Sequence, residues 1–80
     1  MIIGMQCWVA RSGLGWSVLR IARAVKVSSH TVVRFERGEA VGPIIVQKIQ
    51  DTLEKAGVIF IDSNDGGPGA RLRRPQTVAI

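Results

Sequence analysis

Residues 28–37 place hydroxyl, imidazole and guanidinium groups on one short stretch of chain, a combination that suits hydrogen bonding to a polyanion. Ser28 is a good N-cap for a helix that starts after it. His30 and Arg34 are four residues apart and therefore stack on one helix face. Gly38 follows, and glycine commonly ends helices because it tolerates left-handed backbone. The sequence thus predicts a short helix over residues 28–37, with one apolar face and one polar, cationic face that fits the major groove of DNA.

The polar face of this predicted helix carries four side chains able to reach base edges, which are Ser29, His30, Val33 and Arg34. Arg34 can fork onto a guanine or clamp a phosphate, the histidine or the serine can hydrogen-bond a base or the DNA backbone, and the valine can contact a thymine methyl group. Ser28 and Thr31 are expected to position the helix on phosphate. The alternative is that these polar groups only solvate an outer face.

The net charge of +5 is unevenly distributed along the chain. Residues 1–37 carry six basic side chains and one acidic one, whereas residues 38–80 carry five of each. This asymmetry is expected if the first half contacts phosphates, and the alternative is a basic face that only aids solubility. The candidate phosphate contacts are Arg20, Arg23, Lys26 and Arg37, with Ser17 at a predicted helix N-terminus.

Catalytic and metal-binding chemistry finds little support in the residue types. The single cysteine cannot form an internal disulfide, and one histidine leaves no cluster with metal-ligand spacing. Because paired acids and an activated nucleophile are also missing, we expect no enzyme, metal or cofactor. Cys7 is expected to be a small buried apolar residue. Trp8 and Trp16 are expected to be core and lid residues rather than platforms for base stacking.

Length and composition indicate one small domain. Eighty residues are enough for a single core, and an apolar fraction of 46% suggests that a second copy covers some of the apolar surface. The first ten residues are apolar, but no basic region precedes them and Arg11 interrupts them early. We therefore expect neither a signal peptide nor a membrane span, and a cytoplasmic, homodimeric protein.

Apolar periodicity predicts the helices that would hold the polar face in place. A stripe of residues spaced four, three and four apart predicts a first helix over about 3–13: Ile3, Cys7, Ala10 and Leu14. Ser17 can cap a second helix that runs to Val25, and only a short turn then separates it from Ser28. Pro43 suits the start of a fourth helix, which Gly57 ends. Its inner stripe is Val46, Ile49, Leu53 and Ala56.

The end of the chain predicts a β-hairpin. Residues 58–61 are rich in β-formers, and the turn-forming stretch 62–69 separates them from a second strand over 70–74. Both faces of the first strand are apolar and the helices can cover only one, so the other face or an open edge is the candidate for dimerisation. Its residues are Val58, Ile59, Phe60 and Ile61. The chain thus divides into a helical unit (1–57), a hairpin packed on it (58–74) and a loose tail (75–80).

With these residues in place, the chain resembles the Cro/C1-type helix-turn-helix family of XRE-like transcriptional regulators, over about residues 6–74. A short subgroup of that family has this C-terminal hairpin. The matching residues are Ala10-Arg11, Leu14 to Ser17, Ile21-Ala22, Val27-Ser28, Thr31-Val32, Arg34 to Glu36, Gly38, the run from Leu53 to Asp62, Gly66 to Gly69 and Arg71 to Arg73.

The resemblance implies a mainly α fold, a bundle of four or five helices with the hairpin, and a homodimer that binds operator DNA, usually as a repressor. It also implies that Arg11 and Glu36 form an ion pair inside the bundle. Two positions depart from the family pattern. Val18 stands where an amide often meets a phosphate, and Lys26 stands where glycine is usual and would be strained at positive φ.

Two other functions compete with the regulator. The first is an antitoxin or phage accessory repressor that also binds a protein partner through the apolar hairpin. The second is a purely structural or oligomerising role, which predicts DNA binding without sequence preference or salt dependence.

Overall fold

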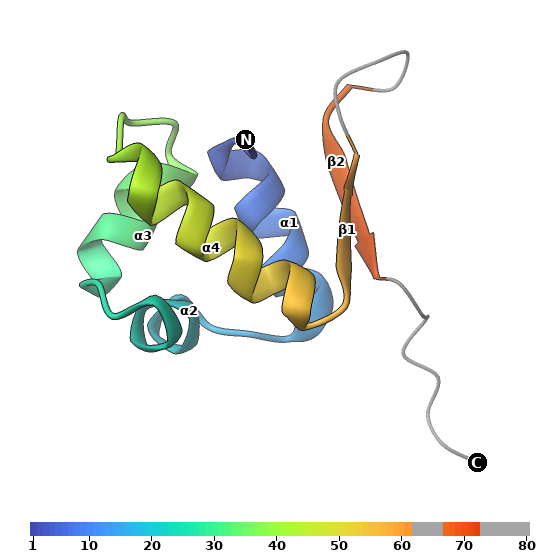
Figure 1. Ribbon diagram of the computed structural model, residues 1–80, viewed down its shortest axis with the longest axis horizontal. Coiled ribbons are helices and arrows are strands. Elements are labelled where there is room, and N and C mark those ends of the chain that lie inside the picture. The colour runs from blue at the N-terminus through green and yellow to red at the C-terminus, as the bar shows by residue number, and fades with distance from the viewer. Residues whose placement is uncertain (62–66, 73–80) are drawn as a thin grey trace.

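The computed structural model describes residues 1–61 and 67–72, which form four helices followed by a two-stranded antiparallel hairpin (Figure 1). The elements in chain order are α1 (Gly4–Leu14), α2 (Val18–Val25), α3 (Ser29–Glu36), α4 (Pro43–Lys55), β1 (Val58–Ile61) and β2 (Gly69–Leu72). The mainly α architecture with a small hairpin is as expected, and the helix ends lie within a residue or so of the predicted ones. The expected turn spans 62–69, and β2 begins one residue earlier than expected, at Gly69. Residues 62–66 of that turn, the end of the second strand at 73–74 and the tail at 75–80 lie outside the described residues.

N-capping serines fix where α2 and α3 begin. The Ser17 hydroxyl accepts a hydrogen bond from the Arg20 amide at 3.1 Å, and the Ser28 hydroxyl accepts one from the Thr31 amide at 3.2 Å. Lys26 ends α2 in the left-handed conformation with φ 61°. The two helices are therefore joined by a turn of only three residues, and this turn places a non-glycine residue in the backbone conformation that glycine favours.

The core lies between the four helices and is closed on one side by the hairpin. Ile21, Val32, Ile49 and Leu53 come from α2, α3 and α4, and their side chains are fully buried. Cys7 is fully buried as well, as expected from its apolar character. Figure 1 shows α1 and α4 lying between α3 and the hairpin, so the hairpin covers the side of the bundle remote from α3.

The start of α1 differs from the predicted stripe. Ile3 precedes the helix and is 48% exposed, whereas Ile2 joins the core in its place. The reason is a close contact with α3: a Cβ on Gly4 would come within 1.9 Å of the Phe35 carbonyl oxygen. Only glycine permits this approach, so Gly4 rather than Ile3 begins the buried face of α1, whereas Cys7, Ala10 and Leu14 of the predicted stripe do face the core.

Trp8 also corrects an expectation, since its side chain is 53% exposed rather than part of the core. The buried residues of α1 are Gly4, Gln6, Cys7 and Ala10. Trp8 directly follows Cys7, so its side chain projects about 100° further around the helix axis, away from the core. Trp16 is half-buried against the core, as a lid residue would be, and the Arg20 guanidinium lies 4.5 Å from the centre of its ring.

The hairpin is held by its apolar face and by one buried amide. Val58 pairs with Leu72 and Phe60 with Ala70, and these four side chains pack on the helical core. The Gln6 side chain, 4% exposed, donates to the carbonyl oxygens of Ile61 and Gly69 at 3.0 Å each, and its own oxygen accepts from the Ile3 amide at 2.9 Å. This single side chain therefore ties the start of α1 to both strands. Among the described residues, no helix is both long and apolar enough to span a membrane.

Candidate nucleic-acid interface

Helix α3 has the two-faced character that its sequence predicts. Val32 and Phe35 are buried in the core. The opposite side presents a mostly exposed set of polar and apolar groups: Ser29, His30 and Arg34 are exposed, and Thr31 and Val33 are half-buried. All four proposed base-reading side chains thus lie on one accessible surface, on which Val33 is the least exposed.

The N-terminus of α3 is held by local hydrogen bonds. The Ser28 hydroxyl caps the helix and also lies 2.9 Å from the Thr31 hydroxyl. Both side chains predicted to meet phosphate are therefore engaged with each other and fix the first turn of α3. The Thr31 amide is taken by this cap, so only the amides that precede it in the turn point out of the helix toward an anion.

Arg34 makes a contact that the sequence did not suggest. Its Nε donates to Oε1 of Glu39 at 3.2 Å, and the two side chains are each 46% exposed. The spacing of five residues crosses the end of α3, so the pair is outside the usual i, i+4 helix pattern. An exposed pair of this kind contributes about 0–1 kcal/mol to stability, so it constrains Arg34 without holding the fold together.

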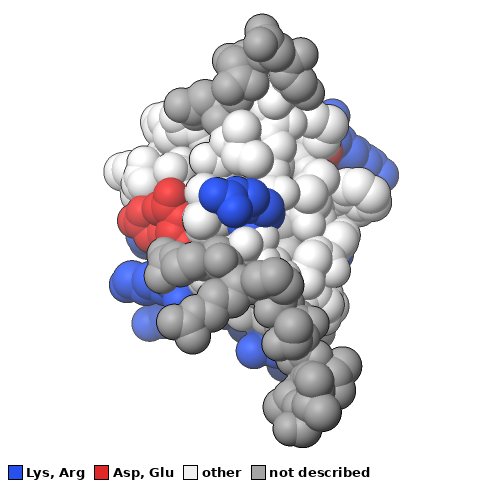
Figure 2. Space-filling model, turned by 90° about the vertical axis from the view of Figure 1, so that its right-hand side faces the viewer, with Lys and Arg blue, Asp and Glu red and all other residues white. Residues whose placement is uncertain are grey.

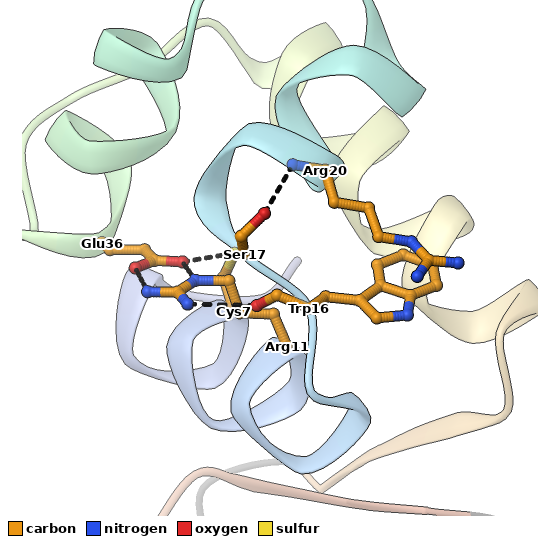
Figure 3. Close-up of polar contacts among 6 residues, drawn as sticks. All are labelled: Cys7, Arg11, Trp16, Ser17, Arg20 and Glu36. Carbon is orange, nitrogen blue, oxygen red and sulfur yellow. Dashed lines mark hydrogen bonds and ion pairs between the residues drawn. The ribbon is translucent and has the colours of Figure 1, made fainter.

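The candidate phosphate contacts are exposed but do not form one cluster. Ser17 and Arg20 mark the N-terminus of α2, where the guanidinium rests on Trp16 (Figure 3). Lys26 lies at the other end of α2 and lines a shallow hollow with Lys48, Asp51 and Lys55 of α4. Arg23 and Arg37 are also exposed. The positive charge is therefore spread along α2 and the end of α3 rather than gathered in a compact patch.

Arg11 and Glu36 form the expected ion pair on the inner side of the interface (Figure 3). Arg11 donates from Nε to Oε2 at 2.8 Å and from Nη2 to Oε1 at 2.9 Å, and its Nη1 donates to the Trp16 carbonyl at 3.2 Å. The side chains are 17% and 10% exposed, respectively. This bidentate pair joins α1 to the end of α3 and the start of the α1–α2 connection, which makes it part of the scaffold.

The Cys7 thiol completes this network by donating to Oε2 of Glu36 at 3.3 Å. Burial, with the hydrogen bond to Glu36, raises the pKa of Cys7 far above its ordinary value. The thiol is therefore neutral and unreactive at physiological pH, as its expected packing role requires.

The hairpin offers less dimerisation surface than the sequence predicted. Val58 is only 2% exposed and Phe60 is half-buried, because both side chains point at the helices. Ile59 and Ile61 are the members of the predicted set that lie on the outer face, with Arg71 opposite Ile59. Viewed from the hairpin side, the described surface is mostly uncharged (Figure 2). On α1, Met5 and Trp8 are further exposed apolar residues: 49% and 53%, respectively.

No group of three or more histidine, cysteine, aspartate or glutamate residues in the described part of the chain could hold a metal ion.

Comparisons with known proteins give no match for this chain among protein-family models, curated proteins or solved structures.

Proposed function

We propose that this protein is a sequence-specific DNA-binding regulator of transcription, with a Cro/C1-type fold that inserts α3 into the major groove. The observation that supports this most is the exposed face of α3, which gathers a hydroxyl, an imidazole and a guanidinium on a helix anchored from behind by its buried apolar side. A helix of two turns with base-complementary groups on its free face is what major-groove recognition requires.

In this proposal the side chains divide the work by chemistry. Arg34 forks onto a guanine, His30 and Ser29 hydrogen-bond base edges, and Val33 contacts a thymine methyl group. The exposed cations surrounding the helix pair contact phosphates, which position the protein without reading sequence. The basic excess in residues 1–37 supports this division, because that half contains α2 and α3.

We also propose that the protein acts as a homodimer and represses its target. Two copies that each carry a net charge of +5 repel one another unless they meet at an uncharged surface. The outer face of the hairpin supplies apolar surface through Ile59 and Ile61, with Arg71 as the described charge beside them. It is remote from α3 in the fold, so α3 remains free for DNA (Figure 1).

The test is selection of bound duplexes from a random DNA pool, followed by fluorescence anisotropy with the selected and a scrambled sequence at several salt concentrations. We expect a clear preference for the selected sequence and a steep fall in affinity with salt. Arg34→Ala should weaken binding to the selected site by about 1–3 kcal/mol, whereas loss of a phosphate contact should weaken all sequences alike. Equal binding of both duplexes would overturn the proposal.

A further inference from the structure

We infer that Glu39 is a positioning residue for DNA reading, because its carboxylate orients the Arg34 guanidinium for a bidentate contact with guanine. This inference rests on the proposed function and deepens it. It assigns a part in specificity to an acidic residue that lies beyond the end of the reading helix, in a connection where a negative charge opposes phosphate binding.

The backbone at the end of α3 brings Glu39 back against Arg34. Gly38 takes a φ of 90°, which reverses the chain direction after the helix. Its amide donates to the Phe35 carbonyl at 3.0 Å, and the Glu39 amide donates to the Arg34 carbonyl at 3.0 Å. These two bonds form a Schellman-type helix end, so the position of Glu39 is set by the main chain.

The contact with Glu39 uses only the Nε of Arg34 and leaves its two terminal amino groups available for DNA. The Arg34 Nε donates a hydrogen bond to the Glu39 carboxylate at 3.2 Å, and no hydrogen bond from the terminal amino groups of Arg34 is found within residues 1–61 and 67–72. Those two amino groups match the O6 and N7 acceptors of guanine. A guanidinium held by its Nε loses less side-chain freedom when it binds, which is the physical basis of preorganisation.

The same carboxylate disfavours DNA that lacks the matching guanine. A negative charge next to the phosphate backbone lowers affinity for every sequence, and only a site that engages the oriented guanidinium offsets this loss. Because Arg34 and Glu39 are both 46% exposed, their pairing contributes little to folding. Glu39 therefore acts on the ratio of specific to non-specific affinity rather than on stability.

The experiment compares the affinities of wild type, Glu39→Gln and Glu39→Ala for the selected and the scrambled duplex. We expect tighter binding of the scrambled duplex by Glu39→Ala, no gain on the selected duplex, and a specificity ratio reduced roughly tenfold, equivalent to about 1.4 kcal/mol. Glu39→Gln should show a smaller reduction, since its amide oxygen can still accept from Nε. In an Arg34→Ala background, Glu39→Ala should leave the ratio unchanged.

Glu54→Gln is the matched control, because it removes one negative charge from α4 instead. Equal tightening on both duplexes by Glu39→Ala would mean that the carboxylate only repels phosphate, and this would overturn the inference. An unchanged ratio with a lowered melting temperature would overturn it as well, in favour of a structural role. After either outcome, the proposed function would still hold if the preference for the selected duplex depended on Arg34. If the wild-type protein showed no sequence preference, both the inference on Glu39 and the proposed function would be overturned.

Discussion

At the scale of single residues, Lys26 adopts a left-handed backbone conformation that strains any residue with a Cβ and that glycine would adopt without strain. A side chain in the left-handed region is about 1–2 kcal/mol less favourable than in the right-handed one, and Lys26 is the described non-glycine residue in that region. The departure from the family pattern at this position therefore corresponds to real backbone strain. What lysine adds in return is a positive charge beside the start of α3.

We expect Lys26→Gly to raise the free energy of unfolding by about 1 kcal/mol, because glycine adopts this conformation without strain. Lys26→Ala, which keeps the Cβ and removes the charge, is the control and should not stabilise. Both variants should weaken binding to selected and scrambled DNA by the same factor if Lys26 contacts phosphate. Urea denaturation and anisotropy measure the two effects, and equal stabilities of the glycine and alanine variants would contradict the strain argument.

Cys7 makes stability depend on pH in the alkaline range. Its pKa is raised in the folded protein by burial and by the hydrogen bond to Glu36, so the folded state holds the proton more tightly than the unfolded chain. The stabilisation is complete below the ordinary thiol pKa of about 8.5 and falls by about 1.4 kcal/mol for each pH unit above it.

Melting curves of wild type and Cys7→Ala from pH 7.5 to 10.5 would measure this dependence. The stability advantage of the wild type over the variant should shrink as pH rises, while lysine titration affects both proteins equally. Parallel curves over this range would show that the thiol does not resist ionisation.

At the scale of elements, the ion pair of Arg11 and Glu36 decides how α1 is held against α3. Glu36 accepts from two nitrogens of Arg11 and from the Cys7 thiol, in a site that is largely shielded from water. Removing its charge leaves the guanidinium poorly compensated in that site. The close approach at Gly4 adds a second constraint on the same pair of helices.

We expect Glu36→Gln to lower the free energy of unfolding by about 2 kcal/mol, since hydrogen bonds to charged groups are worth about 1.5–3 kcal/mol each and the amide retains some of them. Chemical denaturation measures this loss. The preference of the folded fraction for the selected DNA should stay as in the wild type. An unchanged melting temperature would mean that the pair does not stabilise the fold.

At the scale of the whole molecule, the proposed reading helix and the outer face of the hairpin lie on opposite sides of the bundle (Figure 1). Helices α2 and α3 come from the cationic half of the sequence, while the hairpin side is mostly uncharged (Figure 2). In the proposed function, α3 binds DNA on one side while the hairpin binds a second copy on the other.

Sedimentation velocity would test the proposed dimer with Ile61→Lys, which adds charge to the outer face of β1. We expect a concentration-dependent dimer for wild type and a dissociation constant raised at least about tenfold by the variant, because two added cations would meet across the interface. The matched control is Ile44→Lys, the same change on exposed α4 surface. A monomeric wild type, or a larger effect at Ile44, would contradict this assignment.

Where the helices begin and end, and the two-faced character of α3, follow from local sequence alone. Ser17, Ser28, Pro43 and the glycines predict helix ends correctly because caps and breakers act through neighbouring backbone groups. The apolar periodicity of α2, α3 and α4 predicts their buried faces for the same reason, since each helix presents its residues at a fixed angular spacing.

The contacts between elements, in contrast, are set by three-dimensional packing. The exposure of Trp8, the close approach at Gly4, the two strand carbonyls bound by Gln6 and the pairing of Glu39 with Arg34 all depend on how segments meet in space. Local periodicity carries no information on the distance between helices, so it does not predict the close approach of α1 to α3 at Gly4. Which face of the hairpin is covered was likewise undetermined, because both faces are apolar and packing against the helices selects one.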